Sequence, residues 1–389
     1  MCCARARRIH FPRILSILPS GTGTRTGTMR AQLVHRLQRL SRVTPRSTRS
    51  FSSSAARCET SNPKAIAEAF LSKFASGQTF VRKQLIDANQ LRLFSLMLGR
   101  PHIWTNSSTS LEQEEPKQGT PVPAGYHLAY FTPAQMPGVL GLDGTDASFN
   151  PQAPFTRRMW AGGSVHWPGA DPSQSSTHYL KVGDEATETT KVLSCEPKTI
   201  KKTGESMLVV GVEKEFRDGR GDLCVVDKRN WVFRAALDPS KQAKIPKKAA
   251  NLSPEQIDEQ NVGKVVRRYN RDTVQLFRMS ALTFNAHRIH YDLPWAQNVE
   301  GHRNAVVHGP LNMIAMLDLW RDEAMSQGKG QDGIAYPKEL IYRATSPVYA
   351  EEPYRILMPH DGLETSETEI QVTSDDGSSC MKGTLHNWS

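Results

Sequence analysis

The sequence predicts an α+β protein whose folded part consists of two halves, each with helices placed before long strands. Residues 62–240 show two apolar helical patterns followed by long, paired strand patterns. A lysine-rich, proline-containing stretch at 241–251 has little apolar content and is typical of a linker. Residues 252–389 then repeat the same order of elements loosely, without visible sequence identity to the first half. We therefore expect two structurally related halves on either side of this linker.

Each predicted element rests on hydrophobic periodicity and on Gly, Pro and Asp at its ends. In the first half we expect helices at Pro63–Ser76 and Gln84–Gly99, a loop at 105–124, and strands at Glu185–Cys195, Met207–Phe216 and Leu223–Arg234, with turns at 182–184 and 217–221. In the second half we expect a strand at Asp272–Phe277, a short strand at Val306-Val307, a helix at Pro310–Met325, and strands at Glu339–Arg343, Tyr354–Met358 and Glu367–Thr373.

The first 58 residues have a different composition from the rest of the chain. They contain twelve arginines but no lysine and no acidic residue. An Arg- and Ser-rich, acid-free N-terminus is typical of a mitochondrial transit peptide. We expect residues 1–58 to be such a disordered leader, which addresses the protein to the matrix, and the start at Met1 or Met29 stays open. The alternative is a disordered basic tail that binds nucleic acid.

The remainder of the chain is close to neutral, with 37 basic against 39 acidic residues from Glu59 onwards. A nucleic-acid-binding domain would carry its basic residues on the domain itself, so we expect no nucleic-acid partner. No apolar run approaches the roughly 18–20 residues of a membrane-spanning helix. The six cysteines form no C-x-x-C pair, which supports neither a disulfide framework nor a zinc site.

Residues 277–321 contain the candidate chemistry. His287 and His290 are separated by the two residues Arg288-Ile289, and Gly309-Pro310 begins an apolar helix. The first turn of a helix exposes unpaired N–H groups that can hold a developing negative oxygen. A histidine can move a proton at neutral pH. The pair suits addition of water to an α,β-unsaturated thioester, and the reverse elimination. One alternative is that both histidines are structural. Another is that they bind a metal ion together, but no third metal ligand stands at a suitable spacing.

Two separated segments resemble one enzyme family. FNAHRIHYD at 284–292 and VVHGPL at 306–311 resemble MaoC-like (type 2) enoyl-thioester hydratases and 3-hydroxyacyl-thioester dehydratases. FTRRMWAGG at 155–163 is similar to a segment of the branch that contains mesaconyl-C4-CoA hydratase and the mitochondrial type 2 dehydratases, and 180–184 also fits. The resemblance covers residues 65 to 389. It implies a double hot-dog fold, in which two curved antiparallel sheets are each wrapped round a central helix. The first half at 62–240 then shapes the acyl pocket, and the second half at 252–389 is catalytic.

The resemblance also assigns roles to individual residues. His290 is the expected acid/base, and the Gly309 N–H is the expected donor to the thioester carbonyl. Wider relatives have an aspartate where this chain has Asn285, and an asparagine where it has His287. An amide orients water but does not shuttle a proton. We therefore expect Asn285 to orient the water or hydroxyl and His287 to be the second proton group, with Asp292 as a weaker candidate.

Four further residues are candidates for contact with substrate or for structural roles. His308 either contacts substrate or caps the helix, and Trp160 is expected in the core. Arg157 and Arg158 either meet the phosphates of coenzyme A or phosphopantetheine, or form ion pairs with carboxylates.

The predicted reaction is the reversible dehydration of (3R)-3-hydroxyacyl thioesters to trans-2-enoyl thioesters, on coenzyme A or acyl carrier protein, in mitochondrial fatty acid synthesis. One alternative is a mesaconyl-C4-CoA hydratase acting on a branched dicarboxylyl-CoA, with Arg278 and Arg288 as candidate cations. Another is a non-catalytic hot-dog protein for binding or assembly, which the presence of Asn285 favours. The chemistry requires neither a cofactor nor a metal, and a homodimer is compatible with the fold.

Overall fold

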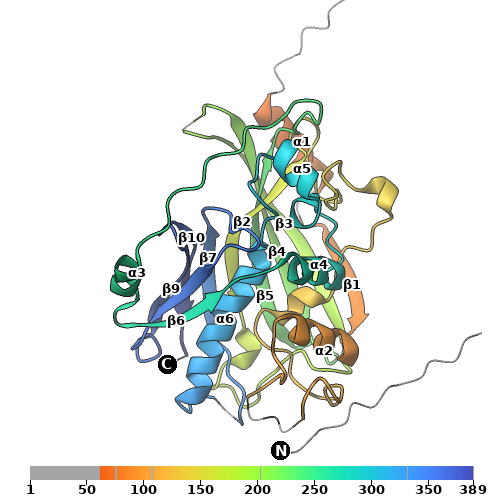
Figure 1. The fold of residues 1–389 in the computed structure, drawn as a ribbon. Coiled ribbons are helices and arrows are strands. Elements are labelled where there is room, and N and C mark those ends of the chain that lie inside the picture. The colour runs from red at the N-terminus through yellow and green to blue at the C-terminus, as the bar shows by residue number, and fades with distance from the viewer. Residues whose placement is uncertain are drawn as a thin grey trace, which may run out of the picture. The chain divides into compact units, whose positions relative to one another are not determined.

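The computed structural model describes residues 62–388, apart from 75–76, 106, 108, 202 and 331 (Figure 1). The predicted leader at 1–58 lies outside the described residues. The first half contains α1 (Pro63–Lys73), β1 (Thr79–Leu85), α2 (Ala88–Met97), η1 (Tyr126–Ala129), η2 (Pro137–Val139), β2 (Arg157–His166), η3 (Pro168–Ala170), β3 (Glu185–Thr199), β4 (Ser206–Arg217) and β5 (Leu223–Arg234). The second half contains α3 (Pro254–Asn261), β6 (Lys264–Tyr269), α4 (Thr273–Leu282), η4 (Arg288–His290), α5 (Leu293–Asn298), α6 (Gly309–Ser326), β7 (Glu339–Ala344), β8 (Tyr354–Pro359), β9 (Glu367–Ser374) and β10 (Ser379–His386).

The strands of both halves form one antiparallel sheet, in the order β1-β3-β4-β5-β2-β7-β10-β9-β8-β6. Five neighbouring strands come from the first half and five from the second, and the two orders mirror each other about the β2–β7 pair (Figure 1). Each half also begins with a helix, a strand and a second helix. This repeat confirms the two related halves that the order of predicted elements indicated.

Strand β2 joins the two halves because it pairs with β5 on one side and with β7 on the other. Its two glycines, Gly162 and Gly163, lie close to the backbone of both neighbours: a Cβ on Gly162 would collide with the Tyr342 carbonyl, and one on Gly163 with the Lys228 carbonyl. Only glycine lets three backbones approach this closely. The AGG part of the 155–163 segment therefore has a structural function at the junction.

Helix α6 is the long central helix, and its predicted position at Pro310–Met325 is confirmed. Twelve of its residues are buried, including the charged Asp318 and Arg321, because the helix packs between the sheet and loops of the first half. The first half has no helix of this length: between α2 and β2 the described residues contain only the short helices η1 and η2. Helix α6 packs in a hydrophobic core that includes residues of both halves, and a second cluster in the first half packs around α1 without it.

The predicted strand at Asp272–Phe277 is wrong, because this segment begins helix α4. The Asp272 side chain accepts a hydrogen bond from the Gln275 N–H at 2.7 Å, which caps the helix. Leu276 and Met279 then lie on its buried face, three residues apart. The predicted strand at Val306-Val307 is also wrong, because Val306 forms only an isolated β-bridge with Tyr349. The other predicted strands and helices are found, most with shifted ends, and strands β1, β2, β6 and β10 and helices α3 and α5 were not anticipated. None of the helices in the described residues is both long and apolar enough to cross a membrane.

A buried ion network ties α6 to the first half. The Asp318 carboxylate accepts a hydrogen bond from the Tyr126 hydroxyl at 3.1 Å and pairs with Arg321 at 2.9 Å. Arg100, from the loop after α2, lies 3.7 Å from the same carboxylate. These groups are shielded from water, so removal of one partner leaves another charge without compensation.

We expect Asp318→Asn to lower the free energy of unfolding by about 3 kcal/mol, because Arg321 loses its buried counter-ion. Urea unfolding followed by circular dichroism measures the change. Glu323→Gln on the same helix is the matched control, because no ion pair of Glu323 is present among the described residues. Equal stability of the two variants would show that the network contributes nothing.

Candidate active site

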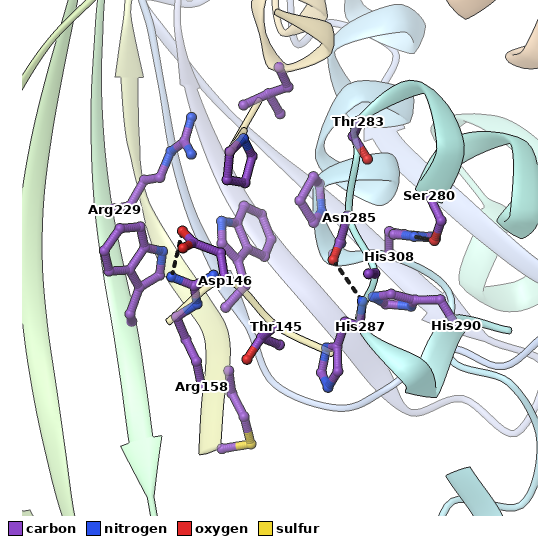
Figure 2. A pocket seen from close by; sticks show the side chains of 18 of the residues that line it. Thr145, Asp146, Arg158, Arg229, Ser280, Thr283, Asn285, His287, His290 and His308 are labelled. Atoms are coloured by element: carbon purple, nitrogen blue, oxygen red, sulfur yellow. Dashed lines mark hydrogen bonds and ion pairs between the residues drawn. The ribbon is translucent and has the colours of Figure 1, made fainter. Parts of the chain in front are cut away.

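A cavity of about 1700 Å³ lies between the sheet of the first half and the segment that links α4 to α6. His287, His290, His308 and Gly309 line it from the second half, together with Asn285. Figure 2 shows these histidines and Asn285 on one wall, and Arg158 and Arg229 on the sheet wall opposite. With the exception of Asp292, the residues predicted from the 284–311 region are therefore brought together in one space that both halves enclose.

His290 ends the short helix η4 and is buried. Its Nδ1 lies 2.7 Å from the Val306 carbonyl oxygen. A carbonyl only accepts, so Nδ1 carries the hydrogen and Nε2 keeps its lone pair. Burial, together with His308 and His287 nearby, holds the pKa of His290 well below its ordinary value. His290 is thus a neutral imidazole at pH 7, oriented as a base.

His308 lies directly against His290, with the two rings stacked 3.6 Å apart between centroids. It occupies the N-cap position of α6, but its side chain makes no capping hydrogen bond. Instead its Nε2 is 2.9 Å from the Ser280 hydroxyl of α4. The alternative in which His308 caps the helix is therefore wrong, because its ring is held by the stack on His290 and by the Ser280 hydroxyl. Burial lowers the pKa of His308 to about 3, so the stacked pair carries no charge.

The amide of Gly309 opens α6 at the cavity wall. The N–H of Gly309 has no hydrogen-bond partner among the described residues, as expected at the first position of a helix. A Cβ at this position would collide with the indole of Trp160, which is itself stacked on Tyr342 at 4.6 Å. Glycine is required here for close packing. Trp160 is only partly buried and lines the cavity, so it belongs to the site as well as to the core.

The side chain of Asn285 is bonded to the backbone of His287. The Asn285 Oδ1 accepts a hydrogen bond from the backbone N–H of His287 at 3.1 Å, which fixes the side-chain amide (Figure 2). The His287 Nε2 lies 4.0 Å from a carboxylate oxygen of Asp143 and 4.0 Å from one of Glu300. Nε2 is buried and has no hydrogen-bond partner among the described residues. His287 is thus enclosed by two carboxylates that sequence reasoning missed.

Both carboxylates are held in place by the other parts of the site. Burial opposes the charge of Glu300, but His287 and Arg157 outweigh it and hold its pKa at about 2. The Asp143 carbonyl accepts a hydrogen bond from the Arg288 N–H at 2.8 Å, which fastens the first-half loop to the histidine segment. Neither residue stands in a motif, and only the folded contact between distant segments reveals them.

The predicted arginines and Asp292 have partners within the protein. Arg157 pairs with Glu300 at 2.7 Å, and Arg158 lies 3.7 Å from Asp146 (Figure 2). Asp292 caps α5 through the Trp295 N–H at 3.1 Å and binds Arg288 at 2.6 Å. Asp292, Arg278 and Arg288 are not among the residues that line the cavity. The ion-pair alternative therefore describes the contacts of Arg157 and Arg158.

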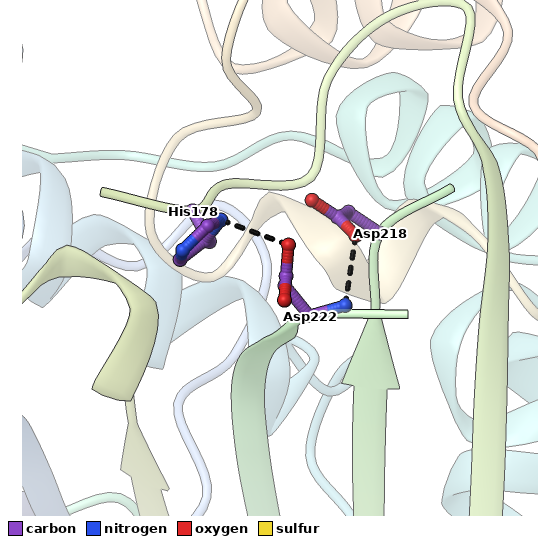
Figure 3. Close-up of side chains that lie close together, drawn as sticks. All are labelled: His178, Asp218 and Asp222. Atoms are coloured by element: carbon purple, nitrogen blue, oxygen red, sulfur yellow. Dashed lines mark hydrogen bonds and ion pairs between the residues drawn. The ribbon is translucent and has the colours of Figure 1, made fainter. Parts of the chain in front are cut away.

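One cluster outside the cavity has the spacing of metal ligands: His178, Asp218 and Asp222 (Figure 3). His178 pairs with Asp222 at 3.1 Å, and Asp218 accepts hydrogen bonds from the N–H groups of Arg220 and Asp222. These bonds build the β4–β5 turn and its neighbouring loop. The cluster is accounted for by turn structure.

Comparison with known proteins agrees with this geometry. The family model described as hydroxyacyl-thioester dehydratase type 2 matches residues 125–350. Mesaconyl-C(4)-CoA hydratase from Chloroflexus aurantiacus is 28% identical over 272 residues, which cover 69% of this chain and 85% of that protein. The mitochondrial hydroxyacyl-thioester dehydratase type 2 of Schizosaccharomyces pombe is 28% identical over 257 residues, which cover 62% and 79%.

The fold also matches solved structures. A MaoC-like dehydratase from Phytophthora capsici superposes with a TM-score of 0.51 at 15% identity, over 80% of this chain and 96% of that one. A second MaoC-like dehydratase gives a TM-score of 0.52 at 14% identity, over 80% and 98%. The α+β double hot-dog arrangement is thereby confirmed.

The buried histidines make stability dependent on pH. An unfolded histidine binds a proton below about pH 6.5, whereas folded His290 and His308 remain neutral. Unfolding then takes up protons, so this contribution is complete above pH 6.5 and is lost as the pH falls. We expect the free energy of unfolding to decrease by up to about 2 kcal/mol per histidine between pH 6.5 and 5.

Urea unfolding at a series of pH values measures this slope. His308→Asn removes one of the two groups, so its slope over the same range should be clearly shallower. If wild type and variant lose stability in parallel, His308 is not held neutral in the folded state.

Proposed function

We propose a reaction for this chain from one premise: the chain belongs to the hydroxyacyl-thioester dehydratase type 2 family. The reaction is the reversible dehydration of (3R)-3-hydroxyacyl thioesters to trans-2-enoyl thioesters, and the protein is a hydro-lyase. The observation that carries this proposal is the pairing of a neutral His290, with its Nε2 free, and the unpaired Gly309 N–H in one cavity. A base and an oxyanion donor are the two groups that removal of a proton next to a thioester requires.

In the dehydration direction, His290 Nε2 accepts the proton from C2 of the acyl chain. Negative charge then develops on the thioester oxygen, where the Gly309 N–H and the partial positive charge at the start of α6 stabilise it. The C3–O bond breaks, the double bond forms between C2 and C3, and the hydroxyl leaves as water after it gains a proton. Hydration follows the same steps in reverse.

The proton for the leaving hydroxyl is assigned to His287. Asn285 has no exchangeable acid, so it positions the hydroxyl or the incoming water. The His287 Nε2 lies 4.0 Å from a carboxylate oxygen of Asp143 and 4.0 Å from one of Glu300. Its ring is 5.3 Å from that of His290, so the two groups serve neighbouring carbons of one substrate. The pair thus replaces the acid/base pair of relatives that have a carboxylate at position 285.

Two observations support the mitochondrial location of this protein. The composition of residues 1–58 and the mitochondrial relative from Schizosaccharomyces pombe both support the matrix as the site of action. There the thioester is carried by acyl carrier protein or by coenzyme A. A homodimer stays a prediction, which sedimentation of the purified protein tests.

We expect His290→Ala to lower kcat for hydration of crotonyl-CoA by roughly 10³-fold, because the base is removed. The disappearance of the conjugated enoyl thioester is followed by absorbance. His360→Ala, which changes an exposed histidine, is the control. Full activity of His290→Ala would refute the site, and no turnover of any enoyl thioester by wild type would favour the non-catalytic alternative.

We expect His287→Gln to lower kcat by about 10²-fold, since the leaving hydroxyl loses its proton donor. Glu300→Gln should lower kcat less, because it removes a carboxylate that lies 4.0 Å from His287 Nε2 and pairs with Arg157. Glu352→Gln is the matched control, as it also breaks an Arg–Glu pair but lies outside the cavity lining. An unchanged kcat in Glu300→Gln would exclude its action through His287.

A further inference from the structure

The inner face of the first-half sheet carries charged residues where an antiparallel sheet facing a core usually carries apolar ones. Five of them, on four neighbouring strands, form what we call the inner-face cluster. They are Arg82 on β1, Glu188 on β3, Lys214 on β4, and Asp227 and Arg229 on β5. Arg82 stands opposite Glu188 in the register, and Lys214 stands opposite Asp227, so the row crosses the sheet without a break.

The members of the inner-face cluster are bonded to one another. Arg82 pairs with Glu188 at 2.6 Å, and the Lys214 ammonium lies 3.1 Å from Glu188. Arg229 pairs with Asp227 at 2.5 Å. Lys214, Glu188 and Asp227 are all more than nine-tenths buried. Burial of ionised groups at this depth is costly unless every charge is compensated.

The compensation of Lys214 is incomplete, because it shares the Glu188 carboxylate with Arg82. The cluster has three cations and two carboxylates when His127, which bonds to Asp227, is counted as neutral, and the Arg82 side chain is 40% exposed to water. The Lys214 ammonium has three N–H groups: it donates to Thr190 at 2.9 Å and pairs with Glu188, and its third hydrogen has no partner in the described structure. Burial, and after it the neighbouring Arg229, lower the pKa of Lys214 to about 8.

This excess charge faces the reaction site. Arg82, Glu188, Lys214 and Arg229 line the same cavity as His290 and Gly309. In Figure 2, Arg229 stands on the sheet wall across the cavity from Asn285. The inner-face cluster and the residues proposed to react therefore border one space.

We propose that the inner-face cluster binds a carboxylate at the far end of the acyl chain, so that the preferred substrates are thioesters of dicarboxylic acids. This inference rests on the proposed dehydratase function and specifies its substrate class. A carboxylate supplies the missing negative charge and accepts from the free Lys214 and Arg229 N–H groups. A methyl end would instead displace water from the cluster and leave its excess charge without a partner. The cations involved are Lys214 and Arg229, not Arg278 or Arg288, which lie outside the cavity lining.

The test compares substrates that differ only at the far end. Wild-type protein is assayed with trans-2-hexenoyl-CoA and trans-2-hexenedioyl-CoA, and with the corresponding eight-carbon pair. We expect kcat/KM to be higher for the dicarboxylic member by on the order of 10²-fold in the pair whose length fits. Equal values, or a preference for the methyl-ended member in both pairs, would overturn the inference while hydration of either would uphold the proposed function.

Lys214→Met should remove this preference, because it deletes the excess charge and keeps the length of the side chain. Lys228→Met is the matched control: Lys228 is adjacent on β5 but lies on the outer face, so its preference should equal that of wild type. Calorimetric binding of the saturated pair, hexanoyl-CoA and adipyl-CoA, tests recognition without turnover. Tighter binding of adipyl-CoA that Lys214→Met abolishes supports the inference even without hydration, and equal binding of the two refutes it.

Discussion

The pairing of β2 with β7 is the constraint on which the rest of the structure depends. It makes one sheet from two halves, and it requires Gly162 and Gly163 so that three backbones can lie close together. The same strand carries Trp160, which packs on Gly309 and thereby fixes the start of α6. The position of Gly309, the proposed oxyanion donor of the second half, is thus set by a residue of the first. Arg157, at the beginning of β2, extends this control to Glu300 and so to His287.

The side chains at the centre of the site are uncharged, and charged side chains lie around them. His290 and His308 form a neutral stack, and Asn285 is uncharged where related enzymes have a carboxylate. Next to His287, the carboxylates of Asp143 and Glu300 each lie 4.0 Å from its Nε2. The two histidines thus have different surroundings, which supports the different roles that we propose for them.

The sequence predicted most of what is local and little of what is distant. Helix α6 was predicted correctly because Gly309-Pro310 and an uninterrupted apolar run mark both its start and its burial. The segment after Asp272 was predicted as a strand. The Asp272 side chain caps helix α4 through the Gln275 N–H three residues later, and the residue pattern alone is also compatible with a strand. Asp143, Glu300 and the inner-face cluster had no signal in the sequence, because isolated charges in strands and loops are normally exposed. The functional roles of His290, His287, Asn285 and Gly309 remain predictions that the described geometry supports.

The division of the cavity wall between the two halves has a consequence for how such a protein diversifies. The reacting groups belong to the segment between α4 and α6, whereas the far wall of the cavity belongs to β1, β3, β4 and β5. Substitutions on the inner face of those strands alter the far wall of the cavity, and they lie apart from the histidines that we propose transfer protons. In this proposal reactivity and selectivity belong to separate stretches of the chain, so that one half can take on a new substrate while the other keeps its chemistry.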